Sequence, residues 1–110
     1  MSHQPETRFK RRVLLDLAQI PTVWVLKTQE RARRGVPDLL ICWRGRFIAI
    51  ELKVDGEKPD ALQFAVLERI GKAGGVATWT SPSTWANDFE TLKMLFGGND
   101  EYPGPTDQGE

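Results

Sequence analysis

Two short apolar runs separated by a tight break limit most strongly how this chain can fold. Residues 39–43 and 47–52 are rich in residues that favour β-strands, and both runs are too short for typical helices. The break contains Gly45-Arg46, which predicts a type II′ turn with glycine at its first central position. The sequence therefore predicts a β-hairpin over residues 39–52.

Three charged residues lie at the open end of this apolar hairpin. Asp38 precedes the first run, while Glu51 and Lys53 are two residues apart at the end of the second, so their side chains leave the same face of a strand. If Arg44 pairs with Phe47 at the turn, the same register places Asp38 opposite Lys53. Because burying a charge costs several kcal/mol unless it is paired or bound to a cation, this patch requires a compensating partner.

A divalent cation is a common partner for two neighbouring carboxylates. Asp38 and Glu51 would repel each other when both are ionised, and a bound cation offsets that repulsion. Carboxylate oxygens are hard ligands that suit Mg²⁺, with Mn²⁺ as a substitute. Lys53 beside such a metal can orient or deprotonate a water molecule, or stabilise a developing negative charge. The three residues therefore predict a catalytic metal site.

The residues around this site resemble a known nuclease family. Pro37-Asp38, followed by Glu51-Leu52-Lys53, matches the PD-(D/E)xK nuclease signature. The two-part signature alone is weak, since such a pattern arises by chance in many proteins. Residues 33–36 (Arg-Arg-Gly-Val), residues 56–59 (Gly-Glu-Lys-Pro) and Gln63 narrow the resemblance to the VRR-NUC branch of that superfamily. The resemblance covers residues 6–81.

The resemblance implies an α/β fold of the restriction-endonuclease-like type, with a mixed central sheet flanked by helices. It also implies a Mg²⁺-dependent endodeoxyribonuclease that hydrolyses the phosphodiester bonds of DNA. The residues that it places in the catalytic site are Asp38, Glu51, Lys53 and Gln63. The metal ligands that it implies are Asp38, Glu51, the carbonyl of Leu52 and an acidic residue of an early helix, which is either Glu6, the better placed of the two, or Asp16.

The VRR-NUC branch includes small phage and bacterial nucleases, and these relatives indicate which substrate and which assembly to expect. Stand-alone members look like homodimers, and some resemble Holliday-junction resolvases. The resemblance therefore implies a homodimer that cuts branched DNA. We expect the exposed side chains of the last helix, such as Trp85 or Phe96, to bury part of the dimer interface.

The charge distribution is compatible with a DNA partner although the formal net charge is zero. Residues 1–34 hold eight Lys or Arg against three Asp or Glu, and residues 97–110 hold four acids without a base. A basic segment that leads into a carboxylate cluster can follow a phosphate backbone, although basic runs also serve simply as solvated surface. The candidate DNA-binding residues are those just before Asp38: Lys27, Arg31, Arg33 and Arg34.

The remaining pattern predicts elements in the order α-β-β-β-α-β-α. Apolar residues at helical spacing predict a first helix from Glu6 that ends at Pro21, and a β-rich run predicts a strand over residues 22–26.

Asp60 and Gln63 form a capping box at the start of a helix that ends at Gly74-Gly75. This capping role and a role of Gln63 at the metal site remain alternatives that can coexist. A strand over 76–80 and a helix from Ser81-Pro82 to Gly97-Gly98 complete the pattern, and the helix between the strands at 50 and 76 predicts a parallel, right-handed crossover.

Length and composition predict one domain over residues 1–98 and a disordered acidic tail over residues 99–110. No apolar stretch is long enough for a membrane span and the N-terminus lacks a signal-peptide pattern, so we expect a cytoplasmic protein of a bacterial or phage-infected cell. The single cysteine, Cys42, lies within an apolar strand and is predicted to be a buried core residue without a catalytic role.

Two other classes of function are compatible with the same residues. One is a DNA-binding module on a nuclease fold without catalytic activity, which an intact set of Asp38, Glu51 and Lys53 disfavours. The other is a structural domain whose carboxylates form salt bridges with Lys53 and nearby arginines. Binding of Mn²⁺ discriminates the second class, because a simple ion-pair cluster should not bind a metal.

Overall fold

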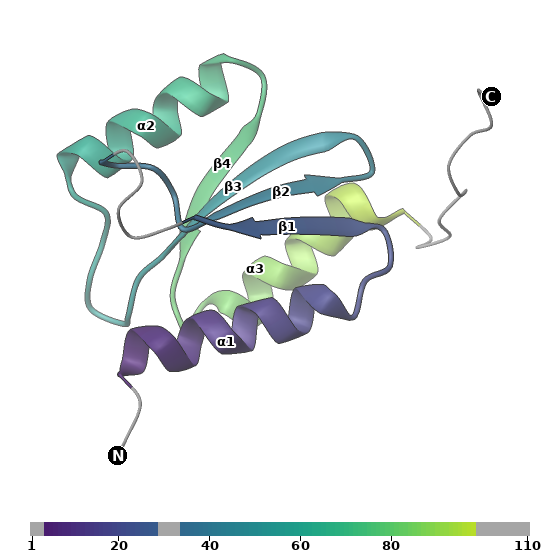
Figure 1. Ribbon diagram of the computed structural model, residues 1–110, viewed down its shortest axis with the longest axis horizontal. Helices are drawn as coiled ribbons and strands as arrows, with labels where there is room; N and C mark the ends of the chain where they lie inside the picture. Colours follow the sequence, from purple (N-terminus) through teal and green to yellow (C-terminus); the bar gives the residue numbers. More distant parts are fainter. Residues whose placement is uncertain (1–3, 29–33, 99–110) are drawn as a thin grey trace.

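The computed structural model describes residues 4–28 and 34–98 (Figure 1). Its elements, in chain order, are α1 (Pro5–Ala18), β1 (Val23–Lys27), β2 (Leu39–Trp43), β3 (Arg46–Leu52), α2 (Ala61–Lys72), β4 (Val76–Thr80), α3 (Trp85–Leu92) and a closing π-helical turn, η1 (Lys93–Gly97). The predicted element order is confirmed, with η1 as an extension of the last helix. The predicted tail over residues 99–110 lies outside the described residues.

Within the described residues the strands form a mixed four-stranded sheet in the order β1-β2-β3-β4. Neighbours along β1, β2 and β3 are antiparallel, whereas β3 and β4 are parallel. The parallel pair arises because α2 connects the two strands across one face of the sheet, which confirms the predicted crossover. Helices α1 and α3 cover the opposite face (Figure 1).

The core lies between the sheet and the layer formed by α1 and α3. Alternate residues of β2 and β3 point into it, and one stripe of α1 packs against them because apolar residues recur there at helical spacing. The buried members of this core are Phe9, Val13, Leu17, Ile20, Leu39, Ile41, Trp43, Ile48, Ile50, Trp85 and Leu92. This core fixes the orientation of β2 and β3, whose ends carry the charged residues Asp38, Glu51 and Lys53.

The hairpin turn differs from the prediction in type and position. Trp43 pairs with Arg46, so the two central turn residues are Arg44 and Gly45, with φ angles of 51° and 86°. Positive φ at both central residues is characteristic of a type I′ turn, whose twist matches that of the flanking strands. The predicted type II′ turn at Gly45-Arg46 is therefore wrong, and so is the predicted pairing of Arg44 with Phe47.

The corrected register changes which residue faces Asp38 across the hairpin. Leu39 pairs with Ile50, so the next position places Asp38 opposite Glu51 and not opposite Lys53 as predicted. The difference is two residues along β3, and a shift of two residues keeps every side chain on its original face. The three charged residues therefore still gather at the same end of the hairpin.

Helix α2 begins and ends as predicted. The Asp60 carboxylate accepts from the backbone N–H of Gln63 at 2.8 Å, and the Gln63 side chain accepts from the backbone N–H of Asp60 at 2.9 Å. This reciprocal pair is the predicted capping box. At the other end Gly74 has a φ of 101°, a left-handed conformation that favours glycine after a helix.

The prediction that Cys42 is buried is wrong. Cys42 is exposed, because it lies on the sheet face opposite the core. Helix α2 lies over part of that face but leaves an apolar patch on β1, on β2 and at the start of β3. We call this patch the open sheet face, which consists of Trp24, Leu26, Cys42 and Phe47.

The prediction that Trp85 is available for a dimer interface is also wrong. Trp85 is fully buried at the start of α3, where its indole N–H donates to Asp16 Oδ2 at 2.8 Å and its ring stacks on Phe89. Phe96 is only partly buried, but its ring packs on Trp43 and beneath the Arg46 guanidinium. Among the helices of the described ranges, none is long and apolar enough to cross a membrane.

Candidate metal and active site

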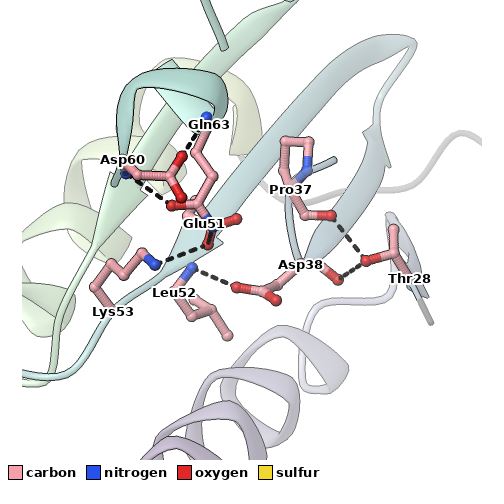
Figure 2. Close-up of polar contacts among 8 residues, drawn as sticks. All are labelled: Thr28, Pro37, Asp38, Glu51, Leu52, Lys53, Asp60 and Gln63. Carbon is pink, nitrogen blue, oxygen red and sulfur yellow. Dashed lines mark hydrogen bonds and ion pairs between the residues drawn. The ribbon is translucent and has the colours of Figure 1, made fainter. Parts of the chain in front are cut away.

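Asp38 lies directly before β2, and its backbone is held by the end of β1. The backbone N–H of Thr28 donates to the Asp38 carbonyl at 2.9 Å. The Thr28 hydroxyl lies 2.9 Å from the carbonyl oxygen of Pro37 and 3.2 Å from that of Asp38, to which it donates (Figure 2). Pro37 is buried and its φ is fixed by its ring. Neighbouring strand ends therefore determine where the Asp38 carboxylate points.

The side chain of Asp38 is oriented by β3. Its Oδ2 accepts from the backbone N–H of Leu52 at 2.8 Å, which leaves Oδ1 free of this contact (Figure 2). The bond places the Asp38 carboxylate beside Glu51, the residue before Leu52.

Glu51 is the buried member of the site, with 4% of its surface exposed. Its Oε2 accepts from Gln63 Nε2 at 2.8 Å and lies 3.5 Å from Lys53 Nζ. Its Oε1 is buried and has no hydrogen-bond partner among the residues that the structure describes. The Oε2 oxygen therefore has two partners, whereas Oε1 is removed from water without a donor. Such burial costs free energy unless a cation binds to the oxygen.

Burial raises the pKa of Glu51 from 4.5 to about 7. The negative charge of Asp38 adds to this effect, whereas Lys53 opposes it by favouring the ionised form. The site therefore holds a carboxyl group that ionises near neutral pH, beside a second carboxylate and a lysine. Perturbed ionisation of this kind is frequent at functional sites.

Gln63 forms the predicted cap and also contacts Glu51, while a role of its amide in holding water or phosphate remains a prediction. Its Oε1 accepts from the Asp60 backbone within the capping box, and its Nε2 donates to Glu51 (Figure 2). The two partners also fix the orientation of the amide, because only the nitrogen can donate to a carboxylate. Gln63 thus connects the first turn of α2 to the metal-binding candidate Glu51.

The donor set fits a hard divalent cation. The unpartnered Glu51 Oε1 and the neighbouring Asp38 carboxylate offer oxygen ligands of the kind that Mg²⁺ and Mn²⁺ prefer. In the described ranges no group of three or more His, Cys, Asp or Glu is arranged to hold a metal. Asp38 and Glu51 are therefore the two carboxylates that the fold itself brings together for an ion, and any further ligand would have to come from outside this pair.

The structure treats the two predicted acidic residues of α1 differently. Glu6 is exposed in the first turn of the helix, and its part in metal binding remains a prediction. Asp16 accepts the indole N–H of Trp85, so its carboxylate has a structural partner. The structure assigns Leu52 a backbone N–H that orients Asp38, while a role for its carbonyl as a metal ligand also remains a prediction.

The predicted DNA-binding residues are only partly described. Lys27 is exposed at the end of β1, and Arg34 is exposed at the start of the segment that leads to Asp38. Arg31 and Arg33 lie outside the described residues. Lys27 and Arg34 thus lie on the chain segments that lead to Thr28 and Asp38. Their contact with DNA stays a prediction.

Thr28 is a residue of the site that the sequence did not indicate. Its hydroxyl bonds a carbonyl nine residues away across a loop, and no local motif predicts such a contact. We expect Thr28→Val to lower the free energy of unfolding by about 1 kcal/mol, since one neutral hydrogen bond is lost. We also expect a lower Mn²⁺ affinity, because Asp38 loses part of its support. Thermal unfolding and calorimetric titration measure the two effects.

The matched variant for this test is Thr28→Ser, which retains the hydroxyl and should restore both quantities. If Thr28→Val binds Mn²⁺ as tightly as the unaltered protein, the backbone N–H of Thr28 is sufficient to hold Asp38.

The raised pKa of Glu51 predicts a specific pH dependence. A carboxyl group with a raised pKa binds its proton more tightly in the folded protein than in the unfolded chain. Without metal, the contribution of Glu51 therefore destabilises the fold progressively as the pH rises from about 4.5 to about 7, and it is constant above that range. Because a metal ligand must be ionised, we expect Mn²⁺ affinity to decrease as the pH falls below about 7.

Calorimetric titrations with Mn²⁺ at pH 6 and pH 8, in buffers of different ionisation enthalpy, test this expectation. Proton release should be greater at the lower pH, where more Glu51 is protonated before binding. Equal affinity and no proton release at both pH values would show that Glu51 is not a ligand.

Comparison with known proteins supports the predicted fold. No family model matches the chain, and no curated protein matches it. A solved structure described as "VRR_NUC domain" superposes with a TM-score of 0.69 and 24% sequence identity, over 81% of this chain and 97% of that one. This likeness shows that the chain has the fold of that domain, and it confirms the mixed α/β architecture expected from the sequence.

Proposed function

We propose that this protein is a metal-dependent endodeoxyribonuclease of the VRR-NUC type, within the PD-(D/E)xK superfamily. The observation that carries the proposal is the Glu51 carboxylate. One of its oxygens is bonded to Gln63 and Lys53, and the other is buried, unpartnered and close to a second carboxylate. The likeness to a solved VRR_NUC domain supports the same assignment through the fold.

Each residue of the site has a distinct part in the proposed hydrolysis. Asp38 and Glu51 would hold Mg²⁺, or Mn²⁺ in its place, with the Leu52 carbonyl and Glu6 as further proposed ligands. A bound divalent cation supplies charge stabilisation at the phosphate and increases the acidity of a bound water. Lys53 orients the attacking water or stabilises the negative charge that develops during hydrolysis, since its ammonium lies beside the Glu51 carboxylate. Gln63 keeps Glu51 in place and can contact water or phosphate.

The proposed substrate is DNA, and branched DNA in particular. A single domain of 12.4 kDa offers little surface for a duplex, and a two-fold dimer would present two active sites to a four-way junction. We therefore propose a homodimer. Because Trp85 is buried, we propose the open sheet face as the interface in place of that residue; it includes Trp24, whose exposed fraction is 61%.

A panel of end-labelled substrates tests the nuclease assignment. Duplex, flap, fork and four-way junction DNA are incubated with the protein in Mg²⁺, in Mn²⁺ and in a chelator. Cleavage that requires the metal supports the proposal. Binding of DNA without cleavage in either metal would indicate a DNA-binding module that lacks activity, and absence of both Mn²⁺ binding and DNA binding would indicate a structural domain.

Light scattering tests the assembly. We expect a mass near twice 12.4 kDa at micromolar protein, and a mass near one chain for Trp24→Lys, because a charge on the open sheet face opposes its burial. Junction binding should exceed binding to linear duplex and should weaken with added salt. A monomer that cuts flaps as readily as junctions would contradict the dimer and leave the nuclease assignment unchanged.

A further inference from the structure

A pocket of about 310 Å³ lies between α2 and the segment that leads to Asp38. Its lining consists of Arg34, Val36, Val66, Arg69, Ile70 and Ala73. At Gly35 the backbone packs closely against α2. Its φ is 84°, and an added Cβ would lie 2.9 Å from the Leu62 side chain and 3.0 Å from that of Val66. This close approach of the backbone holds Arg34 and Val36 against the helix.

Two arginines of this pocket have no carboxylate partner in the part of the chain that the structure describes. Among the described residues, neither Arg34 nor Arg69 forms a salt bridge with a carboxylate, although three lysines do so elsewhere. Arg69 in the last turn of α2 favours the helix dipole, but this role does not account for a second arginine at the same pocket. Two guanidinium groups beside an apolar floor suit a ligand that carries a phosphate and an apolar, planar part.

The pocket lies on the same side of the sheet as Glu51. Gln63, which bonds Glu51, and Arg69 belong to the same helix and are separated by about 9 Å along its axis. Arg34 precedes Asp38 by four residues. A strand of DNA whose phosphate reaches the carboxylates can therefore extend along α2 to the two arginines.

We propose that this pocket binds one unpaired nucleotide of the DNA strand beside the cleavage point. Arg34 and Arg69 hold its phosphate, while Val36, Val66 and Ile70 contact the sugar or base. The volume suits one nucleotide, because it lies at the lower end of the range for small-ligand sites. The inference rests on the proposed nuclease function and identifies the feature of branched DNA that this chain recognises, namely a base released from its stack.

The experiment measures binding without catalysis. A fluorescent single-stranded oligothymidylate of five nucleotides and a labelled blunt duplex are titrated with the protein in a chelator, and fluorescence anisotropy gives the dissociation constants. Arg69→Ala should weaken single-strand binding about tenfold, as expected for one charge-assisted contact to phosphate. The slope of log affinity against log salt concentration should decrease by about one, which corresponds to one lost phosphate contact. Arg69→Lys should be intermediate, because it retains charge without the planar fork.

Lys72→Ala is the matched control, since it removes one exposed charge of the same helix from a residue that is paired with Glu68. It should change single-strand binding less than twofold. A second variant, Ala73→Met, narrows the pocket without changing charge and should weaken single-strand binding but not duplex binding. Thermal unfolding of each variant verifies that the fold is retained.

The outcomes separate this inference from the proposed function. If Arg69→Ala and Ala73→Met bind the oligonucleotide like the Lys72→Ala control, the nucleotide pocket is rejected, while metal-dependent cleavage by the unaltered protein still supports the nuclease. If the unaltered protein does not cleave DNA but the variants lose single-strand binding as expected, the pocket stands and the nuclease assignment fails.

Discussion

Asp38→Asn and Glu51→Gln should each abolish metal-dependent cleavage while the protein stays folded. Each substitution removes one of the two carboxylates that we assign to the cation, and a neutral amide is a poor substitute for a charged ligand. We expect a loss of activity of at least about a thousandfold, comparable to the removal of a central catalytic group. Cleavage of a labelled four-way junction under single-turnover conditions measures this effect.

Stability and activity should change in opposite directions in Glu51→Gln. The raised pKa of Glu51 shows that its ionised form is unfavourable in the folded protein without metal. A neutral amide avoids this cost, which for such a shift is about 3 kcal/mol above pH 7. The melting temperature without metal should therefore hold or rise at pH 8, and the stabilisation by Mn²⁺ should disappear.

Glu57→Gln is a suitable control for both variants, since Glu57 is an exposed acid in the loop after Lys53. It should cleave at the rate of the unaltered protein. Wild-type cleavage by Asp38→Asn or by Glu51→Gln would remove that residue from the proposed mechanism.

Lys53→Ala should have the second largest effect, a decrease in turnover of roughly a hundredfold or more, which is typical of a lost general acid–base group. Its side chain contacts Glu51, but the backbone N–H of Lys53 continues the sheet by donating to Thr80, and this bond survives the substitution. The fold should therefore persist, and Mn²⁺ affinity should decrease little. Single-turnover cleavage and calorimetric titration measure the two quantities.

Lys58→Ala removes an exposed lysine from the following loop and provides the comparison. If Lys53→Ala loses folding and metal binding together, Lys53 is a structural ion-pair partner of Glu51 and not a participant in the chemistry.

The sequence predicted the fold well because most of its elements carry strong periodic patterns. The stripe of Phe9, Val13 and Leu17 and the apolar runs of β2 and β3 all have the burial that their spacing indicates. The grouping of the charged residues also followed from spacing. Glu51 and Lys53 share a face because they are two residues apart on one strand, and a register shift of two residues leaves Asp38 on that same face. These properties depend on local sequence and are therefore predictable.

The errors concern properties that depend on the tertiary arrangement. The turn type depends on Arg44, which adopts a positive φ although arginine has no preference for it. The exposure of Cys42 depends on how far α2 extends over the sheet, and the burial of Trp85 depends on a bond to Asp16 on another helix. No pattern within a single element contains this information.

One amide group in this protein joins a helix cap to the carboxylate that we propose as a metal ligand. The two ends of the Gln63 side chain are engaged, one with the helix start at Asp60 and the other with Glu51. Glutamate would preserve the cap but would bring a third negative charge to the carboxylates, while alanine would lose both contacts. Position 63 therefore has very little freedom to vary, and any process that loosens the first turn of α2 would also release Glu51.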